Sequence, residues 1–271
     1  MEQNQILICS VIYNETIDST IAYKSLICRK LNNTILYDNS INAEFNNSYS
    51  SYEGYIWDSN NSGLSAAYNF AAKYAQNKGY KWLLISDQDT YFPNNAVEAY
   101  EHAIKTNPDI KLFLPKVVTA NGKIMSPVKS THYFSRLSHH SPSGIINPEK
   151  YAIINSGLCI NVEAFFEVGK YNEKVWLDFA DIQFIERFAK KYKDAYVIDL
   201  ECTQSFSNEG QNINQKINRF KSFCDSIRHY EPNNRLNKFW IFCVTLKRAL
   251  SLSKQSKSIE PLSIFVKYYL L

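Results

Sequence analysis

The segment WLLISDQDTYFP, residues 82–93, decides how the rest of the chain is interpreted. It starts as an apolar run typical of a buried strand and ends in Asp87 and Asp89, separated by Gln88. Side chains at positions i and i+2 of an extended segment point to the same side, and two like charges so close raise the pKa of one carboxyl. A Mg²⁺ or Mn²⁺ ion would relieve this repulsion. The segment therefore predicts a divalent-cation site or, more simply, two aspartates that cap the following turn.

Apolar runs alternate with amphipathic stretches on both sides of this segment. We expect strands at 6–14, 33–40, 81–86 and 111–118, and helices at 62–79 and 94–106. This alternation predicts an α/β fold with a mostly parallel central sheet flanked by helices. Ligands of such sheets bind beyond the carboxyl ends of the strands. Three polar groups are therefore expected to meet there: Tyr13 with Asn14, Asp38 with Asn39, and Asp87 with Asp89.

The second half of the chain is harder to interpret. We expect a mobile loop at 119–150, a strand, turn and helix at 151–169, a helix at 176–192, a strand at 195–199 and helices from about 211 onward. Asp178 and Asp181 lie three residues apart and would share one face of the helix at 176–192. They either stabilise its first turn through the helix dipole or provide a general base opposite the metal.

Several classes of protein are excluded by what the sequence lacks. Its six cysteines are scattered without a CxxC pair, and its start lacks the order of a secretion signal, so we expect reduced thiols in a cytoplasmic protein. No apolar run approaches the ~18 residues of a membrane span. The motifs GxGxxG, GxxxxGK, GxSxG and HExxH are missing, and the five histidines have no metal-ligand spacing. We therefore expect the histidines to lie on the surface.

Charge is distributed unevenly along the chain. The net charge is +4, but residues 211–271 contain 11 basic and 3 acidic residues. Apolar residues recur at helical spacing in 237–257, beside Lys247 and Arg248. Such a stripe belongs to a core, to a homodimer seam, or to an amphipathic surface that rests on an anionic membrane through residues 237–271. No nucleic-acid-binding motif accompanies the charge, so nucleic acid is not an expected partner.

Taken together, the motifs resemble those of the family 2 glycosyltransferases with the GT-A fold, and within them the bacterial rhamnosyltransferase-like group. The resemblance covers about residues 5–210 and rests on YDNS (37–40), NNSGLSAAYN (60–69), the DXD motif in ISDQDT (85–90), and the block from Ile154 to Phe184. It implies a catalytic domain at 1–210, with a nucleotide-binding half to about 118 and an acceptor-side half from about 119. Residues 211–271 would form a basic, aromatic-rich helical region.

The resemblance also implies roles for individual residues. Asp181 matches the catalytic base, Asp87 would face the ribose and diphosphate, and Asp87 and Asp89 would hold Mn²⁺ or Mg²⁺. Asp38 would read the base of the donor nucleotide, and Asp178 occupies a neighbouring substrate-side position. The remaining substrate-binding residues would be Tyr13, Asn14, Asn39, Asn61 and Gly63 around the nucleotide, and Asn155, Ser156 and Gly157 beside the sugar.

The activity implied is an inverting transfer of a sugar from dTDP-rhamnose or a UDP-sugar to a hydroxyl of a glycan or lipid-linked saccharide, in the synthesis of a bacterial surface polysaccharide. Such an enzyme is expected in the cytoplasm or on the inner face of the membrane. Two departures, Gln183 and Gln204, stand where many members of the family have an acid and a histidine. They favour an alternative, a catalytically weakened nucleotide-sugar-binding protein. A metal-dependent nucleotidyltransferase is a weaker alternative, because its Gly-rich, basic phosphate-binding stretch is missing near the first strand.

Overall fold

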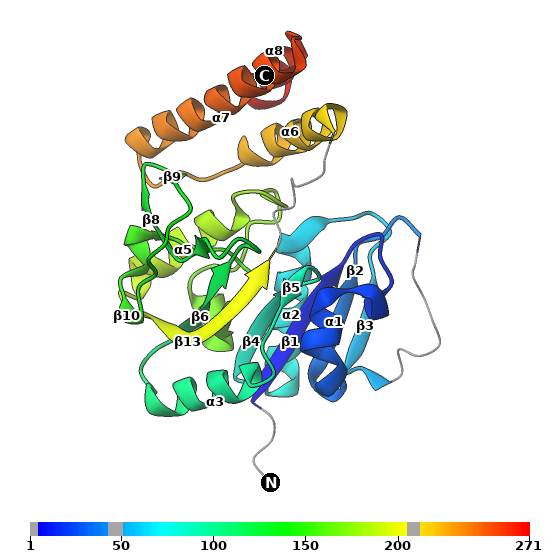
Figure 1. Ribbon diagram of the computed structural model, residues 1–271, viewed down its shortest axis with the longest axis vertical. Helices are drawn as coiled ribbons and strands as arrows, with labels where there is room; N and C mark the ends of the chain where they lie inside the picture. The colour runs from blue at the N-terminus through cyan, green and yellow to red at the C-terminus, as the bar shows by residue number, and fades with distance from the viewer. Residues whose placement is uncertain (1–4, 43–50, 205–211) are drawn as a thin grey trace.

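The computed structural model describes residues 5–42, 51–204 and 212–271, and its centre is a twisted sheet (Figure 1). The strand order is β10-β13-β6-β12-β4-β1-β2-β3, with β5 paired to β13 and β7 paired to β6. The strands that position the site are β1 (Ile6–Ile12), β2 (Thr34–Asp38), β3 (Gly54–Trp57), β4 (Trp82–Asp87), β5 (Thr90–Tyr91), β6 (Leu112–Val118), β12 (Cys159–Asn161) and β13 (Ala195–Gln204).

The strands run mostly in one direction. β1 pairs in parallel with β2 and β4, β2 with β3, and β6 with β13, whereas β12 runs antiparallel between β4 and β6. The predicted α/β fold is confirmed. The sheet is mixed, because β5, β7 and β10 also pair antiparallel with their neighbours.

Both faces of the sheet are buried, which explains the continuous apolar runs. In β1, Leu7 and Cys9 belong to one core cluster, while Ile6 and Ile8 belong to the other. The first cluster includes residues of α2 (Gly63–Lys78), α4 (Val162–Glu167) and α5 (Ala180–Lys191), and the second includes residues of α3 (Ala96–Thr106). The short α1 (Ile21–Ser25) lies beside β5.

Most expected elements are confirmed, including α2, which ends at Gly79 in the left-handed conformation (φ 79°). The prediction of a loop at 119–150 is wrong. This stretch contains β7 (Ile124–Ser126), β8 (Val128–Thr131), β9 (Phe134–Ser135) and β10 (Gly144–Ile146), and β8 also pairs with β11 (Tyr151–Ala152). Strands of two to four residues are too short to show a period of two.

The helix expected at 176–192 begins later, at Ala180, because Phe179 adopts a left-handed φ of 72°. Asp178 therefore precedes the helix, and the shared helix face predicted for Asp178 and Asp181 is wrong. Only Asp181 lies in the first turn of α5.

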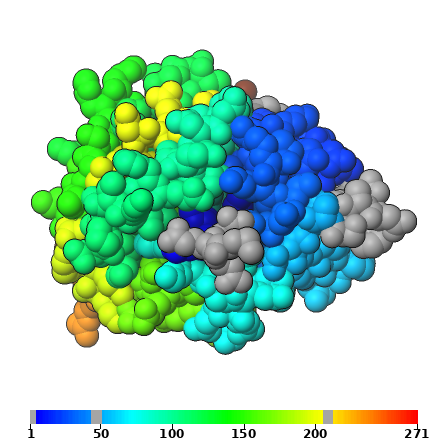
Figure 2. Space-filling model, turned by 90° about the horizontal axis from the view of Figure 1, so that it is seen from below, coloured from blue at the N-terminus to red at the C-terminus, as the bar shows by residue number. Residues whose placement is uncertain are grey.

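The C-terminal region is helical, as expected: α6 (Ile213–Ile227), α7 (Arg235–Ser256), α8 (Glu260–Phe265) and a π-helical turn (Val266–Leu270). These helices lie over the end of the sheet opposite the N-terminus (Figure 1), and little of them is visible from below (Figure 2). Phe220 and Ala249 are fully buried in the same cluster as Leu7, so the region shares the main core. In the described part of the chain, no helix is long and apolar enough to cross a membrane.

Candidate functional site

A cavity of about 400 Å³ opens beyond the carboxyl ends of β1 and β4. It brings together six residues predicted for the site: Tyr13, Asn39, Asn61, Gly63, Asp87 and Asp89. The remaining lining residues are Val11, Leu64, Gln88, Trp176, Leu177, Gln204, Arg219 and Ser222. Residues from the whole length of the chain thus converge at the place where an open α/β sheet binds its ligand.

The two aspartates after β4 are joined by one amide. Gln204, the last residue of β13, donates from Nε2 to Asp89 Oδ1 at 2.9 Å and to Asp87 Oδ2 at 3.4 Å. Asp87 also accepts hydrogen bonds from the hydroxyls of Tyr68, at 3.0 Å, and Ser156. Asp89 lies in the turn after the strand. The two carboxylates are therefore held together by these hydrogen bonds, and not by the alternation of side chains along a strand.

Burial and the nearby Asp87 carboxylate raise the pKa of Asp89 to about 6. The two carboxylates repel each other because they are close together. Among the described residues, neither Asp87 nor Asp89 has an ion-pair partner. Oε1 of Gln204 is buried and has no hydrogen-bond partner among the described residues. The two carboxylates are hard oxygen donors, which suit Mg²⁺ or Mn²⁺ completed by substrate phosphates and water. In the described ranges, no group of three or more His, Cys, Asp or Glu side chains is arranged to hold a metal ion.

Gln88, between the two aspartates, was not assigned a role from the sequence. Its Oε1 accepts from the backbone N–H of Tyr13 at 2.7 Å, and its backbone carbonyl accepts from Ala22 N–H at 3.1 Å. The side chain thus fixes the end of β1 against the turn that carries Asp87 and Asp89. The ring of Tyr13 remains 44% exposed at the cavity.

Another wall of the cavity comes from the start of α2. Gly63 has a φ of 87°, and a Cβ at this position would lie 2.5 Å from the Trp176 carbonyl oxygen, so only glycine fits. Asp58 orders the preceding turn by accepting from the backbone N–H groups of Asn60 and Ser62 and from the Tyr37 hydroxyl. Asp58 also had no predicted role, since a turn aspartate carries no distinctive spacing.

Two residues predicted for the nucleotide pocket lie outside the cavity lining. Asp38 is fully buried, and its carboxylate accepts from Ser40 N–H at 2.8 Å and Tyr55 hydroxyl at 2.6 Å. Asn14 has a left-handed φ of 53° and donates its N–H to Ser40 Oγ at 2.7 Å. Both residues contact Ser40, two residues after the end of β2, and their predicted contacts with the nucleotide stay predictions.

The segment Asn155–Gly157 lies behind the aspartates rather than in the cavity lining. Ser156 donates to Asp87, and Asn155 accepts from the Tyr171 hydroxyl at 2.6 Å. Gly157 packs against Pro115, whose Cγ would lie 2.5 Å from a Cβ at this position. In this structure the segment supports Asp87, and its predicted position beside the sugar stays a prediction.

Asp181 lies in the first turn of α5 and has an unusual environment. Burial and the carboxylates of Asp178 and Asp87 raise the pKa of Asp181 to about 7, against the hydrogen bond from Ile182 N–H. Asp181 is not among the residues that line the cavity, and its predicted role as the catalytic base stays a prediction. A carboxyl with a pKa near 7 is suited to act as a general base at neutral pH.

Asp178 has a different environment, because two arginines neutralise it. Arg219 of α6 donates from Nη2 to Oδ1 at 2.8 Å, and Arg248 of α7 donates from Nη1 to Oδ2 at 3.3 Å. Asp178 thus connects the C-terminal helices to the rest of the fold. It is not among the residues that line the cavity. Arg219 was missed from the sequence because no local motif distinguishes it from the other basic residues of this region.

The sequence was compared with known protein families. The sequence pattern described as glycosyl transferase family 2 matches residues 14–166, more than half of the chain. The chain belongs to glycosyl transferase family 2. The match includes Asp87 and Asp89 and ends before Asp181. No curated protein matches the sequence as a whole.

Solved structures agree with the family at the level of the fold. S. aureus TarS is 14% identical with a TM-score of 0.51, and the match covers 93% of this chain but only 44% of that one. TarS 1-349 in complex with UDP-GlcNAc is 10% identical with a TM-score of 0.54, covering 97% of this chain and 79% of that chain. The family 2 chain described here therefore has the GT-A fold of TarS but spans less than half the length of full TarS.

Proposed function

We propose that the protein transfers a sugar from a nucleoside-diphosphate sugar to a hydroxyl of a glycan or lipid-linked saccharide, with inversion at the anomeric carbon. The observation that supports this best is a pair of carboxylates, Asp87 and Asp89, that line the cavity and have no ion-pair partner among the described residues. Burial and the carboxylates of Asp178 and Asp87 raise the pKa of Asp181 to about 7.

In this proposal Asp181 accepts the proton of the acceptor hydroxyl as that oxygen bonds to the anomeric carbon. The bond between the anomeric carbon and the phosphate oxygen breaks, and the nucleoside diphosphate leaves with the electron pair. Asp87 and Asp89 would hold Mg²⁺ or Mn²⁺, which supplies positive charge to the leaving diphosphate when bound. Gln204 holds the two carboxylates together, and Tyr13 presents a half-exposed ring against which a nucleobase can stack.

A donor screen tests this proposal. We would incubate the protein with Mn²⁺ and UDP-GlcNAc, other UDP-sugars or dTDP-rhamnose, and measure release of the nucleoside diphosphate together with the thermal shift. We expect at least one donor to raise the melting temperature and to be hydrolysed slowly without acceptor. UDP-sugars come first because the TarS 1-349 structure holds UDP-GlcNAc. Neither stabilisation nor release with any donor would refute the proposal.

The same screen distinguishes the alternative of a nucleotide-sugar-binding protein with weakened turnover. One observation favours that alternative: Gln204 contacts both aspartates. An amide binds a metal ion more weakly than the histidine that many family members have at this position. Such a protein would be stabilised by the donor but would release no nucleoside diphosphate, even with manganese.

We also propose that α7 rests on an anionic membrane, where a lipid-linked acceptor would be found. Leu236, Phe239 and Leu250 are 57%, 55% and 52% exposed, and their spacings of 3 and 11 residues place them on one helix face. Replacing all three with serine should reduce flotation with phosphatidylglycerol vesicles. Equal flotation of the variant and the native protein would refute this part of the proposal.

A further inference from the structure

We propose that Arg219, carried by α6, binds the diphosphate of the donor and makes the C-terminal helical region part of the active site. This inference rests on the proposed function. It assigns the cationic side of the site to a residue outside the 14–166 segment that matches the family.

The charge of the cavity lining leads to Arg219. The lining contains two carboxylates, Asp87 and Asp89, and Arg219 is the only Lys or Arg among the described residues that form it. A nucleoside diphosphate carries at least two negative charges into this space. Asp87 and Asp89 attract it only through a metal ion, whereas a guanidinium attracts it directly and matches the geometry of phosphate oxygens.

Among the described residues, the guanidinium of Arg219 makes one hydrogen bond, to Asp178. Nη2 donates to Asp178, while Nε is buried and has no partner among the residues that the structure describes. Asp178 is shared with Arg248, so the three side chains together keep a net charge of +1. Asp178 therefore orients Arg219 without neutralising the cluster. The side chain of Arg219 is 24% exposed, at the surface of the cavity.

The position of α6 over the cavity is fixed by packing and by hydrogen bonds. Phe220 and Phe223 are buried in the main core, and Ser222, three residues after Arg219, lines the same cavity. Beyond α6, the His229 carbonyl accepts from Asn172 Nδ2 at 3.1 Å.

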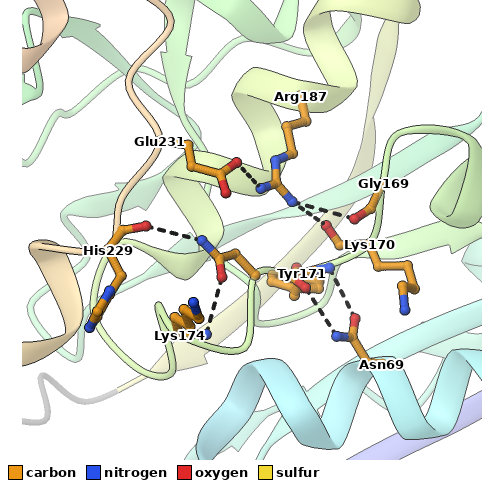
Figure 3. Close-up of polar contacts among 9 residues, drawn as sticks. Asn69, Gly169, Lys170, Tyr171, Lys174, Arg187, His229 and Glu231 are labelled. Atoms are coloured by element: carbon orange, nitrogen blue, oxygen red, sulfur yellow. Dashed lines mark hydrogen bonds and ion pairs between the residues drawn. The ribbon is translucent and has the colours of Figure 1, made fainter.

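The chain after His229 is held to the body of the protein as well. Arg187 of α5 pairs with Glu231 at 2.7 Å and donates to the carbonyl of Lys170 at 3.1 Å (Figure 3). Asn69 of α2 exchanges two hydrogen bonds with the backbone of Tyr171 in the same figure. The segment that follows α6 is therefore joined to α5 through Arg187 and to the 170–172 segment, which α2 contacts through Asn69.

The chain provides a matched control for a purely structural role. Arg248 also pairs with Asp178, at 3.3 Å, and its guanidinium lies 4.4 Å from the centre of the Phe223 ring, but it does not line the cavity. Loss of the ion pair with Asp178 is thus common to Arg219→Gln and Arg248→Gln. Only the first variant removes a cation from the cavity.

The experiment is calorimetric titration of the full chain with uridine, UMP and UDP, and with the thymidine series, with Mn²⁺ and with EDTA. We expect Arg219→Gln to weaken diphosphate binding about 10- to 100-fold while nucleoside binding is unchanged. Arg219→Lys should restore part of the loss. Arg248→Gln should stay within about twofold of the native protein. The loss should persist in EDTA, because an arginine needs no metal to bind phosphate.

Three results would overturn the inference: equal diphosphate affinity in Arg219→Gln, an equal loss for nucleoside and diphosphate, or the same loss in Arg248→Gln. Thermal melting of both variants accompanies the titrations, so that a general loss of folding is recognised. If the native protein binds none of these nucleotides, the proposed function fails and this inference fails with it. If the native protein binds diphosphate and Arg219→Gln binds it equally well, only this inference fails.

Discussion

The chain has two pairs of closely spaced aspartates. Asp87 and Asp89 lie at the end of β4 and just after it, and Asp178 and Asp181 lie just before α5 and in its first turn. Their surroundings are different. Asp178 is paired with Arg219 and Arg248, while in the described residues Asp87, Asp89 and Asp181 have no ion-pair partner. Burial and neighbouring carboxylates raise the pKa of Asp89 and Asp181. The lack of an ion-pair partner among the described residues thus distinguishes the candidate functional acids from Asp178.

The largest expected effect is at Asp181. Asp181→Asn keeps the shape of the side chain but cannot accept a proton, so the turnover number should fall about 10²- to 10⁴-fold. Calorimetry should find donor binding nearly unchanged. Asp225→Asn is the control, since its carboxylate is exposed and paired with Arg228, and its turnover number should be unchanged. Retained transfer in Asp181→Asn would refute the assignment of the base.

The next effect is expected at Asp89, the acid of the other pair. Asp89→Ala removes one of two carboxylates from the donor set, so metal-dependent affinity for the donor should fall at least about tenfold. Titration with donor in Mn²⁺ and again in EDTA measures this difference. The native protein should lose affinity in EDTA, and the variant should not. Unchanged affinity of Asp89→Ala in Mn²⁺ would contradict the metal site.

The pH dependence sharpens the comparison further. A general base works only when ionised, and the pKa of Asp181 is about 7, so kcat/KM should rise about tenfold between pH 6 and pH 8 and then level off. Stability should change in the opposite direction. The folded-state pKa lies above the ordinary value, so Asp181 destabilises the fold increasingly as pH rises toward 7. Asp181→Asn should therefore raise the melting temperature more at pH 8 than at pH 5; the reverse order would contradict the assigned pKa.

The sequence was sufficient for the parts of the site that follow from local pattern. Apolar runs ending in polar residues predicted β1, β2 and β4 and placed Tyr13, Asn39, Asp87 and Asp89 at one edge of the sheet. The short strands between Ile124 and Ile146 could not be predicted, because two to four residues are too few to show an alternating pattern, and tertiary context decides their pairing.

The partners of the acids were also beyond the sequence. Arg219 lies 41 residues from Asp178 and Arg248 lies 70 away, and nothing local relates either arginine to that acid. In the sequence, Gln204 is only a departure from the family pattern. It contacts Asp87 and Asp89 because β13 pairs with β5 and β6. Whether an acid has a basic partner depends on its neighbours in three dimensions. Acidic motifs in the sequence therefore do not show which carboxylates are neutralised.

The smallest expected effect is on stability, and it concerns the compensated acid. Asp178→Asn leaves Arg219 and Arg248 facing each other without an anion, and the three side chains are 22–29% exposed, so we expect a loss of about 1–2 kcal/mol. The matched control is Asp225→Asn, which removes a more exposed pair with Arg228 and should cost less than about 0.5 kcal/mol. Thermal unfolding at low and high salt measures both. Because Asp178 connects α6 and α7 to the body of the protein, equal effects of the two substitutions would mean that packing alone holds the C-terminal helices in place.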